Sequence, residues 1–169
     1  MKTIYLFRHG KSSWKDAQLS DFDRPLNKRG KQDVPFMGQL LLYMNVKPDL
    51  WISSSAKRAW STAKRVATEL KVGKENIIKM DRLYHAEPET LLQVIQGLSV
   101  TASSVILFGH NPGLTELATL LCDYEFTDIP TSGVVGIQFS KAANWTDVNF
   151  HQGKMIFFES PKNNSSAPE

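Results

Sequence analysis

Residues 3–10 read TIYLFRHG, and this stretch decides the fold class more than any other part of the chain. Residues 3–7 are a short apolar run without alternation, which predicts a buried strand, and the polar letters RHG follow it without a break. The same arrangement returns at residues 104–110, which read SVILFGH. We therefore expect two buried strands, each of which ends directly in a glycine-flanked histidine.

Around these two strands the sequence alternates short apolar runs with amphipathic stretches, which is typical of an α/β domain. Further strands are expected at residues 50–53, 76–80, 134–139 and 149–158, the last two antiparallel at an edge. Helices are expected at residues 27–45, 54–70, 88–98 and 111–121, with Asn27, Ser54 or Ser55, and Asn111 as N-caps and a kink or restart at Pro35. The region 1–159 is expected to form a single domain, and residues 160–169 a disordered tail.

Composition narrows the functional class. The 169 residues suffice for one domain, and a formal net charge of +3 mildly favours anionic partners. Acidic residues are scattered among the basic ones, so no nucleic-acid-binding stripe is expected. No apolar run could cross a membrane, and the first ends at Arg8, too early for a signal peptide. The cytoplasm is the expected compartment. The single cysteine, Cys122, is expected to be a buried apolar residue.

The two histidines that follow strands, His9 and His110, are the first candidates for a site. Ligands of open α/β sheets bind beyond the carboxyl ends of the strands, so the two imidazoles are expected to face one pocket. Arg8 lies beside His9, and Arg58 lies in the first turn of a predicted helix, where the backbone already favours anions. Because guanidinium groups match phosphate oxygens, these residue types together predict a phosphate site.

Several motifs carry a resemblance to a known family. They are, in chain order, LFRHGKS (6–12), RPL (24–26) with Gly30, SSSAKRA (53–59) with Thr62 and Ala63, LYHA (83–86), GHNP (109–112) and TSG (131–133). The first, third and fifth of these resemble signatures of the histidine phosphatase superfamily, which includes the cofactor-dependent phosphoglycerate mutases. The others are similar to motifs of the compact SixA-type phosphohistidine phosphatases. The resemblance implies a three-layer α/β/α sandwich with a mostly parallel central sheet.

The resemblance also implies a mechanism without a cofactor or a metal ion. His9 would attack phosphorus and carry the phosphoryl group covalently, with its ring held by a backbone carbonyl, for which Gly10 is the candidate. Arg8, Arg58 and His110 would bind the phosphoryl oxygens, where charge accumulates in the transition state. The expected enzyme is a metal-independent phosphatase acting on phosphohistidine in a protein, such as a histidine phosphotransfer domain.

Several points stay open on the sequence alone. The proton donor is His85, Glu87 or no residue at all, because imidazole leaves more readily than an alkoxide. Ser12 either touches the phosphate or stabilises its loop, and Asn111 is a further candidate for substrate binding. The alternatives are a phosphatase for a small phosphorylated metabolite, an inactive module that binds phosphorylated ligands, and a metal hydrolase.

Overall fold

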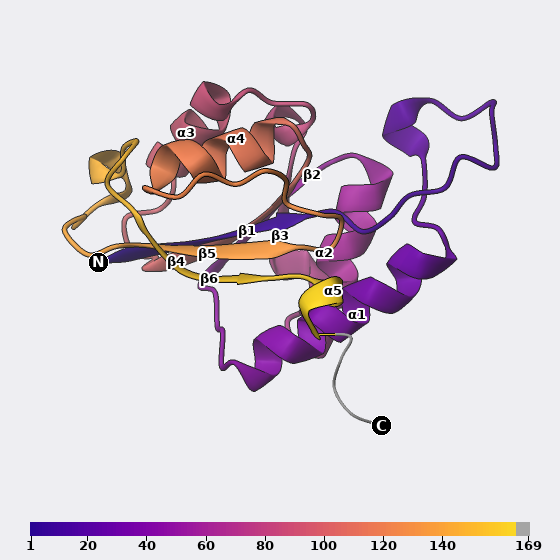
Figure 1. Ribbon diagram of the computed structural model, residues 1–169, viewed down its shortest axis with the longest axis horizontal. Helices are drawn as coiled ribbons and strands as arrows, with labels where there is room; N and C mark the ends of the chain where they lie inside the picture. Colours follow the sequence, from indigo (N-terminus) through magenta and orange to yellow (C-terminus); the bar gives the residue numbers. More distant parts are fainter. Residues whose placement is uncertain (165–169) are drawn as a thin grey trace.

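A six-stranded sheet forms the middle layer of the computed structural model, which describes residues 1–164 (Figure 1). The strands are β1 (Lys2–Arg8), β2 (Leu50–Ser54), β3 (Ile77–Met80), β4 (Ser104–Gly109), β5 (Val134–Phe139) and β6 (Lys154–Glu159). Their order across the sheet is β3-β2-β4-β1-β5-β6. The pairs β3–β2, β2–β4 and β4–β1 are parallel, whereas β5 and β6 are added in antiparallel pairs. The predicted sheet, mostly parallel with antiparallel closing strands, is confirmed.

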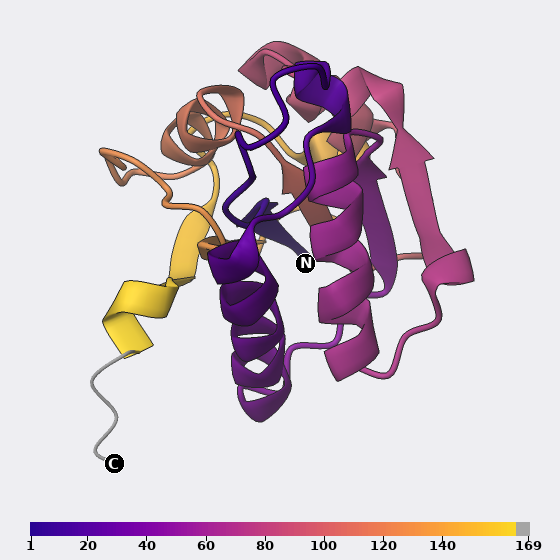
Figure 2. The same cartoon turned by 90° about the vertical axis from the view of Figure 1, so that its right-hand side faces the viewer.

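Helices cover both faces of this sheet. They are α1 (Lys28–Tyr43), α2 (Lys57–Glu69), α3 (Pro88–Gln96), α4 (Gly113–Leu121) and the short α5 (Pro161–Asn164). Figure 1 shows α3 and α4 on one face of the sheet, and Figure 2 shows α1 and α2 side by side on the other. Each face has its own apolar cluster, because alternate side chains of β1 and β4 point to opposite sides. This is the three-layer sandwich expected from the sequence.

The register of the sheet brings the predicted site residues together. In the parallel pair of β1 and β4, Arg8 lies opposite Gly109, so His9 and His110 leave the sheet at the same edge. On the other side of β4, Ser53 of β2 lies opposite Phe108, and therefore the end of β2 reaches this edge as well. Three neighbouring strands thus deliver their carboxyl ends to one place.

Two predicted helix starts differ from the observed ones. Helix α2 begins at Lys57 with Ala56 as its N-cap, and no side chain caps it, so the expected Ser54 or Ser55 cap is wrong. Helix α4 has Pro112 as its N-cap residue, although the side chain of Asn111 accepts a hydrogen bond from the backbone N–H of Thr115 (3.1 Å). Asn27 does cap α1, as expected.

Other boundaries also differ from the prediction. Helix α1 passes through Pro35 without a restart. The last strand begins at Lys154 rather than at residue 149, because a turn occupies the residues before it. In the region expected to be a disordered tail, Pro161–Asn164 forms α5, which the Asn164 amide ties to Glu159 and to the backbone of Ser160. The remainder of the predicted tail, residues 165–169, lies outside the described residues.

Candidate active site

The rings of His9 and His110 lie side by side at the edge of the sheet, with 5.1 Å between their centroids. Both residues are buried, with 8% and 4% of their surface exposed. They come from positions a hundred residues apart in the chain, and the parallel register of β1 and β4 is what places them together. The structure therefore brings together the two imidazoles that the sequence singled out.

The ring of His9 is held in one orientation by its own chain. Its Nδ1 lies 2.7 Å from the carbonyl oxygen of Gly10, and since a carbonyl only accepts, Nδ1 carries the hydrogen. The Gly10 peptide is fixed in turn, because its N–H donates to Oγ1 of Thr62 (2.9 Å). The neutral ring consequently presents the lone pair of Nε2. The Gly10 carbonyl expected from the sequence is the group that holds the ring.

Burial keeps this imidazole neutral. Removal from water is the largest effect on His9 and lowers its pKa to about 3. The Gly10 hydrogen bond opposes this change, and the positive charges of Arg58, Arg8 and Arg24 add to it. At neutral pH the ring therefore carries no proton on Nε2. A neutral imidazole with a free lone pair is the form in which histidine is a nucleophile.

Arg58 lies against the nucleophilic nitrogen. Its Nε–H donates to Nε2 of His9 (3.3 Å), while Nη1 and Nη2 donate to the backbone oxygen (2.6 Å) and the carboxylate (3.0 Å) of Asp21. The residue stands in the first turn of α2 and is 3% exposed. Its position follows from the short connection between β2 and α2, which starts the helix at the site.

His110 is bound on one side and unpartnered on the other. Its Nε2 lies 2.7 Å from Oγ of Ser54, and its buried Nδ1 has no hydrogen-bond partner. The pKa of His110 is lowered to about 2, chiefly by burial and then by its neighbours His9 and Arg58. Ser54, expected to cap a helix, thus serves the site instead.

Arg8 stands at the side of the pair. Its Nη1 donates to the backbone oxygen of Ile129 (2.8 Å) and lies 3.5 Å from the carboxylate of Asp128. Its Nε is buried and has no hydrogen-bond partner. Burial lowers the pKa of Arg8, and Asp128 opposes that change. The Nε–H of Arg8 is therefore free, and the positive charge of the guanidinium helps to lower the pKa of His9.

Asn111 fixes the same loop rather than facing His9. Its Nδ2 donates to Asp128 (2.7 Å) and to the backbone of Ile129 (3.0 Å), and its Oδ1 accepts two hydrogen bonds from Thr115. An amide side chain has two N–H groups and two lone pairs, so these contacts use all of them. In this arrangement Asn111 has no free hydrogen-bonding group for the expected contact with substrate.

Asp21 is bound by residues that surround the two imidazoles. Its Oδ2 accepts from Nη2 of Arg58, from the hydroxyl of Tyr84 (2.6 Å) and from Nε2 of His85 (3.0 Å). Its Oδ1 accepts from Nη1 of Arg24 (3.0 Å). Partial burial raises the pKa of this carboxyl, but the hydrogen bonds from Tyr84, His85, Arg58 and Arg24 outweigh it and hold the pKa far below its usual range. The group is therefore a carboxylate at neutral pH.

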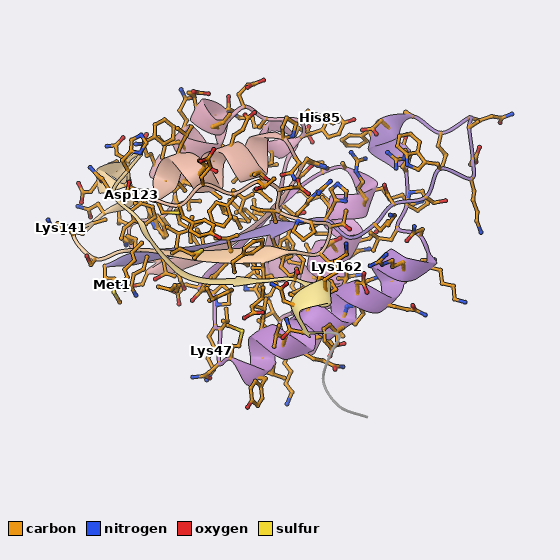
Figure 3. The ribbon with its side chains drawn as sticks, in the orientation of Figure 1. Met1, Lys47, His85, Asp123, Lys141 and Lys162 are labelled. Carbon is orange, nitrogen blue, oxygen red and sulfur yellow. The ribbon has the colours of Figure 1, made fainter. Side chains whose placement is uncertain are left out.

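The two proton-donor candidates are placed differently. His85 is half-exposed, stacks on the ring of His110 (5.5 Å between centroids, 20° between planes) and touches Asp21. Figure 3 shows His85 beside the loop that carries Asp21. Glu87 is exposed at the start of α3, and among the described residues no hydrogen bond or ion pair joins it to the site. The structure brings His85 to the site but not the carboxylate of Glu87.

Ser12 lies behind the site, where its hydroxyl accepts a hydrogen bond from Arg24, which in turn binds Asp21. Of the two interpretations left open for Ser12, this contact favours loop stabilisation. The sequence places Asp21 only among the loop residues expected to rim the pocket, with Asp16, Asp23, Lys11 and Lys15, and the sequence interpretation missed Tyr84 as a site residue. Tyr84 could have been found from its place in the LYHA motif, whereas nothing in the sequence distinguishes Asp21 from the other acids of its loop.

Metal-binding clusters and membrane-spanning helices are both absent from the described residues, 1–164. No group of three or more His, Cys, Asp or Glu side chains in that part of the chain is arranged to hold a metal ion. None of its helices combines the length and apolarity needed to cross a bilayer.

Comparison with known proteins gives consistent results. Residues 4–87 match the histidine phosphatase superfamily, branch 1. An uncharacterised chloroplastic protein of Arabidopsis thaliana is 32% identical over 128 residues, or 71% of this chain. The aligned chain spans only 59% of that relative's length.

Two solved structures match nearly the whole chain. One is an Agrobacterium tumefaciens protein provisionally assigned as the phosphohistidine phosphatase SixA, with a TM-score of 0.80 and 26% identity. The other is the protein histidine phosphatase SixA complexed with tungstate, with a TM-score of 0.80 and 22% identity. In both cases the match covers 95% of this chain and 98% of the other.

The fold, the paired histidines at the sheet edge and these similarities define a phosphatase of the histidine type. The chain belongs to the histidine phosphatase superfamily, and its fold is of the SixA type.

Proposed function

We propose that this phosphatase removes phosphoryl groups from phosphohistidine in a protein, without a metal ion, by way of a covalent intermediate on His9. The observation that carries the proposal is the state of the His9 ring. Its hydrogen is on Nδ1, bound to the Gly10 carbonyl, and the lone pair of Nε2 faces Arg58 at 3.3 Å. A phosphoryl group in front of Nε2 would meet the nucleophile and a cation together.

The first step forms the bond between Nε2 of His9 and phosphorus and breaks the P–N bond of the substrate. Where the second ring nitrogen of the substrate histidine carries a proton, the electron pair of the broken bond gives a neutral imidazole. His9 retains its Nδ1 hydrogen and becomes the phosphorylated, cationic ring, still held by Gly10. Protons and charge therefore balance without an added acid.

The second step is hydrolysis. Water attacks phosphorus, the P–Nε2 bond breaks, the electron pair returns to His9 and one proton passes to solvent with the release of inorganic phosphate. In both steps Arg58 and the free Nε–H of Arg8 would stabilise the charge on the phosphoryl oxygens.

His110 would donate a further hydrogen bond. If the Ser54 hydroxyl donates to its Nε2, the proton of the neutral ring is on the unpartnered Nδ1, which is then a donor for phosphate. The Ser54 oxygen also accepts from the backbone N–H of Ala56 (3.2 Å), which leaves the hydroxyl hydrogen free to make that bond.

The proton donor matters only for substrates with a poorer leaving group. Of the two candidates, His85 is the better supported, because it touches Asp21 and stacks on His110, whereas Glu87 lines the neighbouring groove. Phosphohistidine needs neither. We therefore expect phosphohistidine to be hydrolysed faster than alkyl phosphates.

A groove lies beside the site. It has a volume of about 820 Å³ and shares Asn111 and Asp128 with the neighbourhood of Arg8. Its lining combines the apolar side chains Pro112, Leu120 and Phe126 with the carboxylates of Glu87, Glu89, Glu116 and Glu125. This volume is within the range of small-molecule clefts, so the groove has room for a metabolite as well as for residues that flank a phosphorylated side chain.

The test is substrate profiling of the purified protein beside its His9→Ala variant. A phosphohistidine-bearing protein and a panel of sugar, nucleotide and amino-acid phosphates are compared, with and without EDTA. We expect phosphohistidine to be preferred, EDTA to have no effect, and His9→Ala to lower turnover by at least about a thousandfold, in line with the loss of a covalent nucleophile.

The matched control is His151→Ala, which removes an exposed histidine of a distant turn. Full activity of His9→Ala would contradict the mechanism, and a preference for one small phosphate would identify a metabolite phosphatase. Loss of activity in EDTA would point to a metal hydrolase. Binding of a phosphorylated ligand without any turnover would indicate an inactive binding module.

A further inference from the structure

One carboxylate, that of Asp21, is bound by the groups that a phosphoryl ligand would need. Its Oδ2 accepts hydrogen bonds from Nη2 of Arg58 (3.0 Å), from the hydroxyl of Tyr84 (2.6 Å) and from Nε2 of His85 (3.0 Å). Arg24 binds the other carboxylate oxygen at 3.0 Å. Four donor side chains, from three stretches of the chain, thus converge on one small anion.

Asp21 and a substrate phosphoryl group would both bind the guanidinium of Arg58. A phosphoryl group attacked by Nε2 of His9 must place its oxygens within reach of Arg58, whose Nε is 3.3 Å from that nitrogen. The same guanidinium already holds Asp21 through both of its Nη atoms. Two anions on one guanidinium repel each other and compete for its N–H groups.

From these contacts we infer that Asp21 is an internal anion that fills the phosphate position when no ligand is bound, and that a phosphoryl group must displace it. The inference rests on the proposed function of the same site. If so, Asp21 lowers the affinity of the site for phosphoryl ligands. A ligand can contact Arg58, Tyr84 and His85 only when the contacts of Asp21 with the same residues are broken. A phosphoryl dianion, with two charges and three oxygens, can compete with one carboxylate.

The segment that carries Asp21 is built so that it can leave. It forms only a short 3₁₀ turn, η1 (Asp21–Asp23), with no buried residue, and the side chain of Asp21 is 41% exposed. Apart from the carboxylate contacts, the backbone oxygen of Asp21 accepts from Nη1 of Arg58 (2.6 Å), and Phe22 packs edge-on against Tyr84 (5.1 Å between centroids). Arg24 remains fixed without Asp21, since it also donates to the backbone of Ser13 (3.1 Å) and lies over the Trp14 ring.

The experiment measures the binding of tungstate, an oxyanion that cannot be hydrolysed, by isothermal titration calorimetry without turnover. The variants are Asp21→Asn, which keeps the shape but not the charge, and Asp21→Ala. Asp23→Asn is the matched control, because Asp23 is in the same turn and its carboxylate binds Ser20 (2.8 Å) rather than the site. Unfolding curves check that each variant is folded.

We expect both Asp21 variants to bind tungstate about tenfold more tightly than the natural chain, the effect of one lost charge-assisted contact, and Asp23→Asn to stay within about twofold of it. Unchanged or weaker binding by folded Asp21→Asn would overturn the inference and show that Asp21 serves to position Arg58. The proposed function is separable from this result. If the natural chain binds tungstate but Asp21→Asn binds no better, only the proposed role of Asp21 is wrong. If neither protein binds tungstate, the proposed phosphate site is wrong as well.

Discussion

At the scale of single residues, the chemistry of this site depends on how His9 is held. The Gly10 carbonyl fixes its hydrogen, burial keeps it neutral, and Arg58 faces its lone pair. None of these is a property of histidine itself, whose ordinary pKa would leave it partly protonated near neutral pH. The protein makes a nucleophile from an ordinary side chain by excluding water and occupying one nitrogen.

This neutrality has a consequence for stability. His9 and His110 have pKa values of about 3 and about 2 in the folded chain, whereas in the unfolded chain both titrate near the ordinary histidine pKa of 6.5. Between these values the unfolded state binds protons that the folded state does not. Stability is therefore complete above the unfolded pKa and is lost as the pH falls below it.

The expected loss is about 2 kcal/mol for each histidine between about pH 7 and about pH 5. Urea unfolding across this range measures it. His9→Gln should remove about half of the dependence on pH, since one of the two buried imidazoles is then absent. A free energy of unfolding that does not change over this range would mean that the imidazoles are hydrated and protonated in the folded protein.

The sequence was sufficient to find some of these residues and not others. His9, Arg58 and His110 stand at positions that local patterns define, directly after an apolar strand or in the first turn of a helix. Asp21 stands in a loop without periodicity. Its importance arises from contacts with Arg58 and with Tyr84, at separations of 37 and 63 residues that no local pattern encodes.

At the scale of elements, the start of α1 fixes the beginning of the site loop. The Asn27 side chain accepts from the backbone N–H of Gly30 (2.9 Å), and the Asn27 N–H donates to the backbone oxygen of Lys11 (2.9 Å). A Cβ on Gly30 would come within 2.3 Å of that same Lys11 oxygen, so only glycine allows this close approach. The helix cap and the loop after β1 are therefore one structural unit.

Replacing the cap tests this unit. Asn27→Ala leaves the N–H of Gly30 without its acceptor and should lower the free energy of unfolding by about 1 kcal/mol. Chemical denaturation measures the change. Asn27→Asp, which keeps an acceptor oxygen, serves as the control and should recover most of the loss. If both variants were as stable as the natural chain, the cap would contribute nothing.

The elements that the sequence misjudged share a physical cause. Ser54 has the composition of a helix cap, but a short connection from β2 sends its hydroxyl to His110 instead. The tail after Ser160 lacks periodicity, yet Pro161–Asn164 forms a turn of helix through contacts with Glu159 and Ser160. In each case a tertiary or capping contact outweighed the local preference, as short polar segments allow.

At the scale of the whole molecule, function follows from the order of the strands. Because β4 lies between β1 and β2, the residues after three parallel strands meet at one edge, with α2 beginning beside them. The α/β class was predictable, since apolar runs and helical periods are local, and the three-layer sandwich was what the family resemblance implied. The depth of the site and the groove along α4 were not, because they depend on how loops far apart in the chain pack against each other.

The central claim is that His9 carries the phosphoryl group during turnover, and trapping the phosphorylated enzyme tests it most directly. The protein is mixed with a phosphohistidine-bearing protein, quenched in alkali within one turnover, digested and mapped by mass spectrometry. We predict one acid-labile phosphoryl group on the peptide that contains His9, and none in His9→Ala treated in the same way. Turnover with no phosphorylated peptide, or with the phosphoryl group on His110 or His85 instead, would contradict it.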